Sequence, residues 1–195
     1  MPNLTSTIAN PPPEADPASE SLPAHLNPAN YPQTRHLPDS NIYLELTYGP
    51  LNPSKHLAHI RSPRAGANVL FLGTTRSTFD NRPVARLTYT SYAPLALRTL
   101  EKIALDAVAK HGLLGISIAH RLGEVAVEEE SIAIAVSAGH RGAAWKAGEE
   151  VLEECKAKAE IWKREEFEGE REGEGEWRAN RDTDAGGNIV RGNER

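Results

Sequence analysis

Two lysines stand seven positions apart in the stretch CKAKAEIWKREEF, where an apolar helical pattern gives way to acidic residues. If a helix continued from Lys156 to Lys163, the two ammonium groups would share a face, because seven residues make almost two helical turns. Such proximity lowers the pKa of one lysine, and a neutral amine can serve as a general base or a nucleophile. In the structural alternative, Lys156 complements the negative end of the helix dipole, and Lys163 pairs with Glu160 or Glu166.

Two other cationic groups stand at the ends of predicted strands. His140 and Arg141, in SAGHRGAAW, open a predicted helix, whose first N–H groups suit an anion that an arginine can also grip. Arg76, in FLGTTRSTF, follows a short apolar strand, and strand ends are common positions for binding groups. The alternatives are that His140 only caps the helix and that both arginines are solvated.

The sequence lacks the motifs of several enzyme classes. It contains no Gly-x-Ser-x-Gly elbow, no His-Glu-x-x-His zinc helix and no phosphate-binding Walker loop. Cys155 is the only cysteine, so we expect no internal disulfide and no metal site. The net charge of −5 argues against nucleic-acid binding, which needs a basic face. Without a long apolar stretch or a signal peptide, the protein is expected to be cytoplasmic and not bound to a membrane.

The 195 residues fit one globular domain with a tail at each end. Residues 1–40 are rich in Pro, Asn and Ser and have little apolar periodicity, which predicts a disordered extension. Residues 41–182 form the predicted domain, and residues 183–195 form a flexible tail. Alternating Glu and Gly from Glu165 to Glu176 predict a flexible, self-repelling run near its end.

Strands and helices are interleaved in the predicted domain without a regular βαβ repeat, which indicates the α+β class. Apolar spacing and β-branched content distinguish the two kinds of element. The strands at 66–76 and 84–92 are expected to pair through the turn STFDNRP. Predicted strands cover 41–48, 66–76, 84–92, 115–123, 124–127 and 131–138, and predicted helices cover 53–60, 94–110 and 142–158.

The chain resembles the large, catalytic subunit of molybdopterin synthase in the order of five sequence blocks. These blocks are GANVLFLGTTR, LTYTSYAPLA, ISIAHRLGEVAVEEESIAIAVSAGHRGAA, CKAKAEIWKREEF and WRANRD. The resemblance extends from about Ile42 to Asp182. It implies an α/β hammerhead fold, with a mainly antiparallel sheet and two long helices.

The resemblance also implies an activity and its partners. Members of that family convert cyclic pyranopterin monophosphate to molybdopterin by installing two sulfurs as a dithiolene. The sulfur arrives as a thiocarboxylate at the C-terminal Gly-Gly of a small, ubiquitin-like subunit. Two large subunits form a homodimer inside a heterotetramer. No cofactor is expected, because the partner subunit supplies the sulfur.

Motif matches carry the functional positions of the family over to this chain. Lys156 matches the essential lysine, which would act as an acid or base or stabilise a tetrahedral species, and Lys163 is the second catalytic residue. Arg76 would complete an anion site. The substrate-binding residues implied by the resemblance are His140, Arg141, Lys156, Lys163, Arg164, Glu165 and Arg76.

The chain departs from the family pattern at Glu160, where several relatives have a proline before the Trp-Lys segment. Proline breaks a helix, so the bend between Lys156 and Lys163 lacks its usual enforcement. The residues alone leave another function open, which is a non-enzymatic module that binds a peptide C-terminus or a phosphorylated ligand in the same basic pocket.

Overall fold

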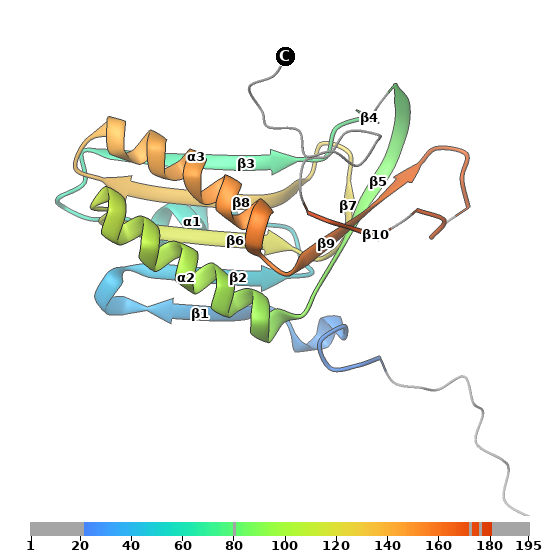
Figure 1. The fold of residues 1–195 in the computed structure, drawn as a ribbon, viewed down its shortest axis with the longest axis horizontal. Coiled ribbons are helices and arrows are strands. Elements are labelled where there is room, and N and C mark those ends of the chain that lie inside the picture. The colour runs from blue at the N-terminus through green and yellow to red at the C-terminus, as the bar shows by residue number, and fades with distance from the viewer. Residues whose placement is uncertain (1–21, 80, 172, 176, 181–195) are drawn as a thin grey trace, which may run out of the picture.

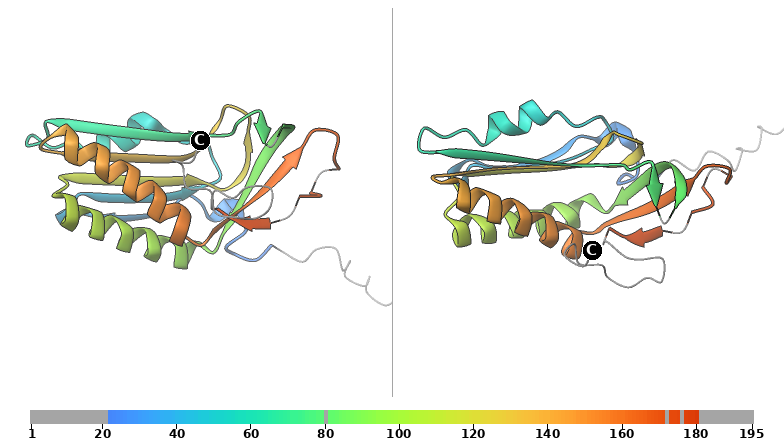
Figure 2. Two further views of the ribbon diagram at one scale, coloured as in Figure 1. Left: turned by 45° about the horizontal axis from the view of Figure 1, so that its top comes forward. Right: turned by 90° about the horizontal axis from the view of Figure 1, so that it is seen from above.

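The computed structural model describes residues 22–79, 81–171, 173–175 and 177–180. The chain forms two β-sheets that lie end to end, and two long helices cover one face of the first sheet (Figure 1). These helices, α2 (Ala93–His111) and α3 (Arg141–Lys158), lie side by side, and the short helix α1 (Pro53–His59) covers the opposite face (Figure 2). This arrangement confirms the α+β class.

The first sheet has five strands in the order β1-β2-β6-β8-β3. Only β2 and β6 are parallel, so the sheet is mainly antiparallel, as the resemblance implies. β8 is buried along almost its whole length, which explains its continuous apolar run SIAIAVSA. The strands are β1 (Gln33–Leu37), β2 (Ile42–Thr47), β3 (Ala67–Thr74), β6 (Gly115–Arg121) and β8 (Glu130–Ala138).

The second sheet has the order β10-β9-β5-β4, and β7 also pairs with β5. It extends from the end of the first sheet at which α3 ends (Figure 1). Its strands are β4 (Thr78–Phe79), β5 (Arg82–Ser91), β7 (Gly123–Ala126), β9 (Ile161–Phe167) and β10 (Trp177–Ala179). Two 3₁₀ turns, Pro28–Asn30 and Pro38–Ser40, flank β1.

The core lies between the first sheet and the two long helices. Small residues on α3 let the helix approach the sheet closely, and Gly148 faces Val69 and Val136. Gly112 caps the C-terminus of α2, and its φ of 62° suits glycine. The α3 residues in this core are Ala144, Ala147, Val151 and Cys155. Among the described residues, no helix has the length and apolar character of a membrane span.

The expected disorder up to residue 40 is wrong for the segment that precedes β2. β1 pairs antiparallel with β2, with Gln33 opposite Leu46. The Tyr31 ring packs edge-on against Tyr48, with ring centroids 4.8 Å apart. β1 is an exposed edge strand, so backbone hydrogen bonds hold it and its side chains carry no apolar pattern. Residues 1–21 and 183–195 lie outside the described part of the chain.

Two further expectations are corrected by the sheet topology. β3 pairs with β8 and not with β5, because the segment after β3 carries the chain into the second sheet. Of the residues predicted to form the hairpin with β5, only the short β4 after β3 pairs with it. The predicted flexible run beginning at Glu165 is wrong at its start, since Glu165–Phe167 complete β9. Repulsion between the neighbouring carboxylates is relieved, because Glu165 pairs with Lys163 and Glu166 pairs with Arg86 and Arg164.

Candidate active site

The helix that carries Lys156 ends before it reaches Lys163. α3 stops at Lys158, and Ala159 adopts an extended conformation with φ −67° and ψ 138°. Lys163 therefore lies in β9, and the two lysines do not share a helix face. Lys156 is half-buried in the last turn of α3, where a cation complements the helix dipole. The bend forms although the chain has Glu160 and no proline at this position.

β9 divides the KREE sequence between its two faces, because side chains alternate along a strand. Lys163 and Glu165 lie on one face, opposite Tyr89 and Leu87 of β5. Arg164 and Glu166 lie on the other face, so the structure does not bring Arg164 together with Lys163.

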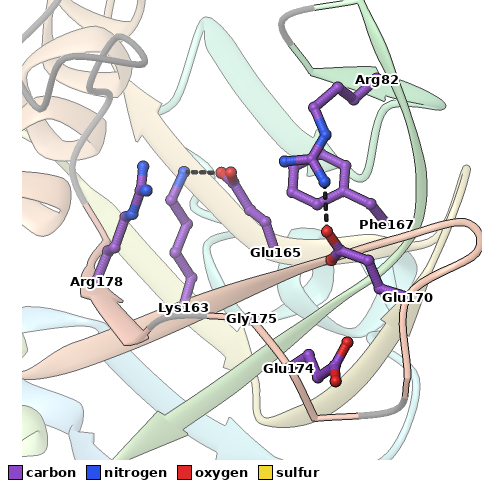
Figure 3. A pocket seen from close by; sticks show the side chains of 8 residues that line it. All are labelled: Arg82, Lys163, Glu165, Phe167, Glu170, Glu174, Gly175 and Arg178. Atoms are coloured by element: carbon purple, nitrogen blue, oxygen red, sulfur yellow. Dashed lines mark hydrogen bonds and ion pairs between the residues drawn. The ribbon is translucent and has the colours of Figure 1, made fainter.

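Lys163 and Glu165 line a pocket of about 180 Å³. Lys163 Nζ lies 3.0 Å from Glu165 Oε1, and the two side chains are 13% and 11% exposed. Figure 3 shows them pointing toward each other. Lys163 thus pairs with Glu165 and not with Glu160 or Glu166. The pocket residues are Arg82, Lys163, Glu165, Phe167, Glu170, Glu174, Gly175 and Arg178.

Positive and negative groups are balanced around the pocket. Arg82 pairs with Glu170, and its guanidinium carbon lies 3.6 Å from the centroid of the Phe167 ring. Arg178 of β10 lies opposite Lys163 in the strand register and beside it in Figure 3. An anion would bind to the Lys163 ammonium here only by replacing the Glu165 carboxylate as its partner.

The opposite face of β9 holds a buried carboxylate cluster. Glu166 accepts hydrogen bonds from Arg86 Nε at 2.9 Å, Thr88 Oγ1 at 2.9 Å and Arg164 Nη2 at 2.7 Å. Burial alone would raise the pKa of Glu166, but these hydrogen bonds lower it to about 2. The Arg164 guanidinium also lies over the Trp177 ring, 4.9 Å from its centroid. In this chain Arg164 thus belongs to a structural cluster.

His140 and Arg141 lie at the far end of α3 from Lys156. His140 caps the helix, because its Nδ1 accepts a hydrogen bond from the Gly142 N–H at 3.2 Å. Both residues are exposed. With a rise of 1.5 Å per residue, Lys156 lies about 24 Å from His140 along the helix. A single chain therefore does not bring these groups together.

Arg76 lies at the other end of the first sheet from His140. β3 begins opposite Ala138, next to His140, and runs toward the second sheet (Figure 1). Arg76 is exposed and follows Thr75, which forms an isolated bridge with Val127. It therefore shares the Lys156 end of the molecule.

The sequence did not predict several residues of the pocket. The alternation of Ile161, Lys163, Glu165 and Phe167 on one face is a strand signal, and it could have revealed that Phe167 joins the pocket. Arg82 and Arg178 have no such local signal, because only the pairing of β5 and β10 with β9 brings them to the pocket.

A neutral histidine, His120 of β6 in the first sheet, contacts the segment that follows β10 of the second sheet. His120 Nδ1 lies 2.8 Å from Arg121 O and must donate to it, so Nε2 accepts from Asn180 Nδ2 at 3.1 Å. The Tyr89 ring, on the β5 residue opposite Lys163, packs edge-on at 4.8 Å. Burial lowers the pKa of His120 to about 4, although the hydrogen bond to Arg121 opposes this shift. His120 thus fixes the segment after β10.

Cys155 packs in the core as predicted. Burial, with a smaller contribution from Glu154, raises the pKa of its thiol to about 12, so the thiolate is not available as a nucleophile. Across the described ranges, no group of three or more His, Cys, Asp or Glu residues is placed to hold a metal ion.

Sequence comparisons match the chain to one protein family and to relatives that share one name. A family model described as MoaE protein matches residues 46–158, more than half of the chain. The Ajellomyces capsulatus protein named molybdopterin synthase catalytic subunit is 77% identical, over 88% of this chain and 84% of the relative. The Coccidioides immitis protein of the same name is 74% identical, over 85% of this chain and 84% of the relative.

Solved structures show the same fold. Molybdopterin synthase from Staphylococcus aureus superimposes with a TM-score of 0.63 at 28% identity, covering 68% of this chain and 94% of that one. A chain from the Helicobacter pylori complex of subunits 1 and 2 of molybdopterin-converting factor gives a TM-score of 0.54 at 25% identity. That match covers 66% of this chain and 91% of the other.

Proposed function

The chain belongs to the MoaE family, and from this we infer that it is the catalytic subunit of a molybdopterin synthase. It transfers sulfur to a pterin precursor to form the dithiolene of molybdopterin, a step of molybdenum cofactor biosynthesis. The observation that carries this conclusion is the 77% identity to a molybdopterin synthase catalytic subunit across 88% of the chain.

We propose that the sulfur arrives on a small, ubiquitin-like subunit that ends in a Gly-Gly thiocarboxylate. The Helicobacter pylori relative, solved together with a second subunit, supports a two-subunit enzyme. The buried, protonated Cys155 also supports an external sulfur source. The proposal needs no cofactor, because the thiocarboxylate brings the sulfur in its reactive form. We place the reaction in the cytoplasm, where the single thiol would stay reduced.

We assign the chemistry to the two lysines on either side of the bend. Lys156 would donate or accept a proton, or stabilise the oxyanion that forms when the thiocarboxylate carbonyl is attacked. Lys163 is paired with Glu165 at the pocket, where its ammonium would hold an anionic group of the substrate or the partner tail. Arg76 lies at the same end of the molecule and would add positive charge.

We propose that the site is completed across a homodimer inside a heterotetramer. His140 and Arg141 lie about 24 Å from Lys156 along α3, which exceeds the length of a pterin monophosphate. If these residues and the lysines act on one substrate, a second copy of the chain must supply one of the two groups. Their exposure at a helix N-terminus supports a role in binding a phosphate.

Reconstitution tests this function. The full chain is mixed with the pterin precursor and a small subunit that carries a C-terminal thiocarboxylate, and dithiolene formation is measured. The matched control is the same small subunit with a terminal carboxylate. Product that forms with the thiocarboxylated small subunit, and not with the carboxylate control, supports the proposal. Tight binding of both forms without product would indicate a non-enzymatic module that captures a peptide C-terminus.

A further inference from the structure

The bend between α3 and β9 is fastened through Glu160. The side chain of Thr99, on α2, donates from Oγ1 to Glu160 Oε1 at 3.0 Å. The side chain of Ser91, at the end of β5, donates from Oγ to the Glu160 backbone carbonyl at 2.8 Å. Two elements that are distant in sequence thus hold one residue of the bend.

This attachment fixes where β9 begins. Ser91 lies opposite Ile161 in the strand register, next to Glu160. The Asn180 N–H donates to the Ile161 carbonyl at 3.1 Å, so the segment after β10 joins at the same point. Lys156 precedes the bend on a helix and Lys163 follows it on a strand. The separation of the two lysines therefore depends on the angle at Glu160.

The Glu160 carboxylate is retained at an energetic cost. Its Oε2 atom is buried and has no hydrogen-bond partner among the described residues. An unsatisfied buried acceptor costs about 1–3 kcal/mol, and more when the group is charged. Such a group calls for an explanation, and a positioning role for the other oxygen, Oε1, which accepts from Thr99, provides one.

We propose that Glu160 and Thr99 form a positioning pair for sulfur transfer, which sets Lys163 relative to Lys156. Neither side chain contacts the substrate in this proposal, and both act through the bend. The inference rests on the proposed function, because it assumes that the two lysines serve one reaction.

Two features of the backbone at the bend fit a proline at position 160. Ala159 has ψ 138°, the extended conformation that a following proline requires. In the described part of the chain, the Glu160 N–H donates to no backbone carbonyl, so a proline there would remove no such bond. Glu160→Pro should therefore hold the same bend without Thr99.

The experiment measures kcat and KM of the full chain with the thiocarboxylated small subunit. Glu160→Ala and Thr99→Val should each lower kcat by about tenfold to a hundredfold, the loss that a misplaced catalytic group produces. Glu160→Gln keeps the acceptor for Thr99 and should retain wild-type kcat. Glu160→Pro should also retain it, and adding Thr99→Val to that variant should change nothing further.

Wild-type kcat in both Glu160→Ala and Thr99→Val would overturn the proposal, as would an equal effect of Thr99→Val in the Glu160→Pro background. Circular dichroism and urea unfolding separate a loss of kcat from a loss of fold. If the wild-type chain forms no dithiolene, the sulfur-transfer function fails. Crystal structures then still test the pair, because Glu160→Ala and Thr99→Val should change the distance between Lys156 and Lys163, whereas Glu160→Pro should not.

Discussion

Acidification should destabilise the protein through His120. Its pKa is lowered from 6.5 to about 4, so between these pH values the unfolded chain binds a proton that the folded chain does not. The stabilisation is fully present above pH 6.5 and is lost as the pH falls to about 4. A shift of this size corresponds to about 3 kcal/mol, at 1.36 kcal/mol for each pH unit.

Urea unfolding of the wild type and His120→Gln between pH 7.5 and pH 4 measures this contribution. The difference between their free energies of unfolding should change by about 3 kcal/mol across the range. His36→Gln is a surface control, because His36 is exposed on the edge strand β1, and at pH 7.5 its free energy of unfolding should stay within about 0.5 kcal/mol of the wild type. Parallel curves for the wild type and His120→Gln would refute the assignment of a neutral, buried His120.

Two further predictions concern the carboxylate cluster and the oligomer. Glu166→Gln should lower the free energy of unfolding by about 2 kcal/mol at pH 7, because it leaves the partly buried donors of Arg86 and Arg164 poorly paired. The difference from wild type should shrink as the pH falls from 4.5 toward 2 in urea titrations. Arg141→Ala and Lys156→Ala should each be inactive alone, yet reassociating the two should restore about a quarter of wild-type turnover, since half of the dimers are mixed and each has one intact site. No recovery would contradict a site that is completed across the dimer.

Helices and buried strands follow closely from the sequence. The apolar stripe of Ala144, Ala147, Val151 and Cys155 predicts α3, and these residues all pack in the core. The continuous apolar run of β8 predicts a strand buried on both faces. These elements are predictable because the apolar residues of a buried face recur with the period of the helix or strand that carries them.

Edge strands and strand partners do not follow from the sequence in this way. β1 is mostly exposed, so no apolar alternation marks it. The choice of β8 as the partner of β3 depends on packing beneath α3, which no local pattern records.

The candidate site shows the same division. Motif matching identified Lys163 and Glu165, and the structure places both at the pocket. It could not show that Arg164 turns to Glu166 on the opposite face, because that depends on β9 being a strand. The distance between His140 and Lys156 likewise becomes visible only once α3 is seen to run between them.

We assign the sulfur transfer to Lys156, and single-turnover formation of dithiolene measures how much Lys156 contributes to it. Lys156→Ala is compared with Lys158→Ala. In the wild type, Lys158 is exposed and paired with Glu154. Lys156→Ala should reduce the rate by about a hundredfold or more while the complex with the small subunit stays intact, and Lys158→Ala should match the wild type. A wild-type rate in Lys156→Ala would show that Lys156 does not carry out the transfer.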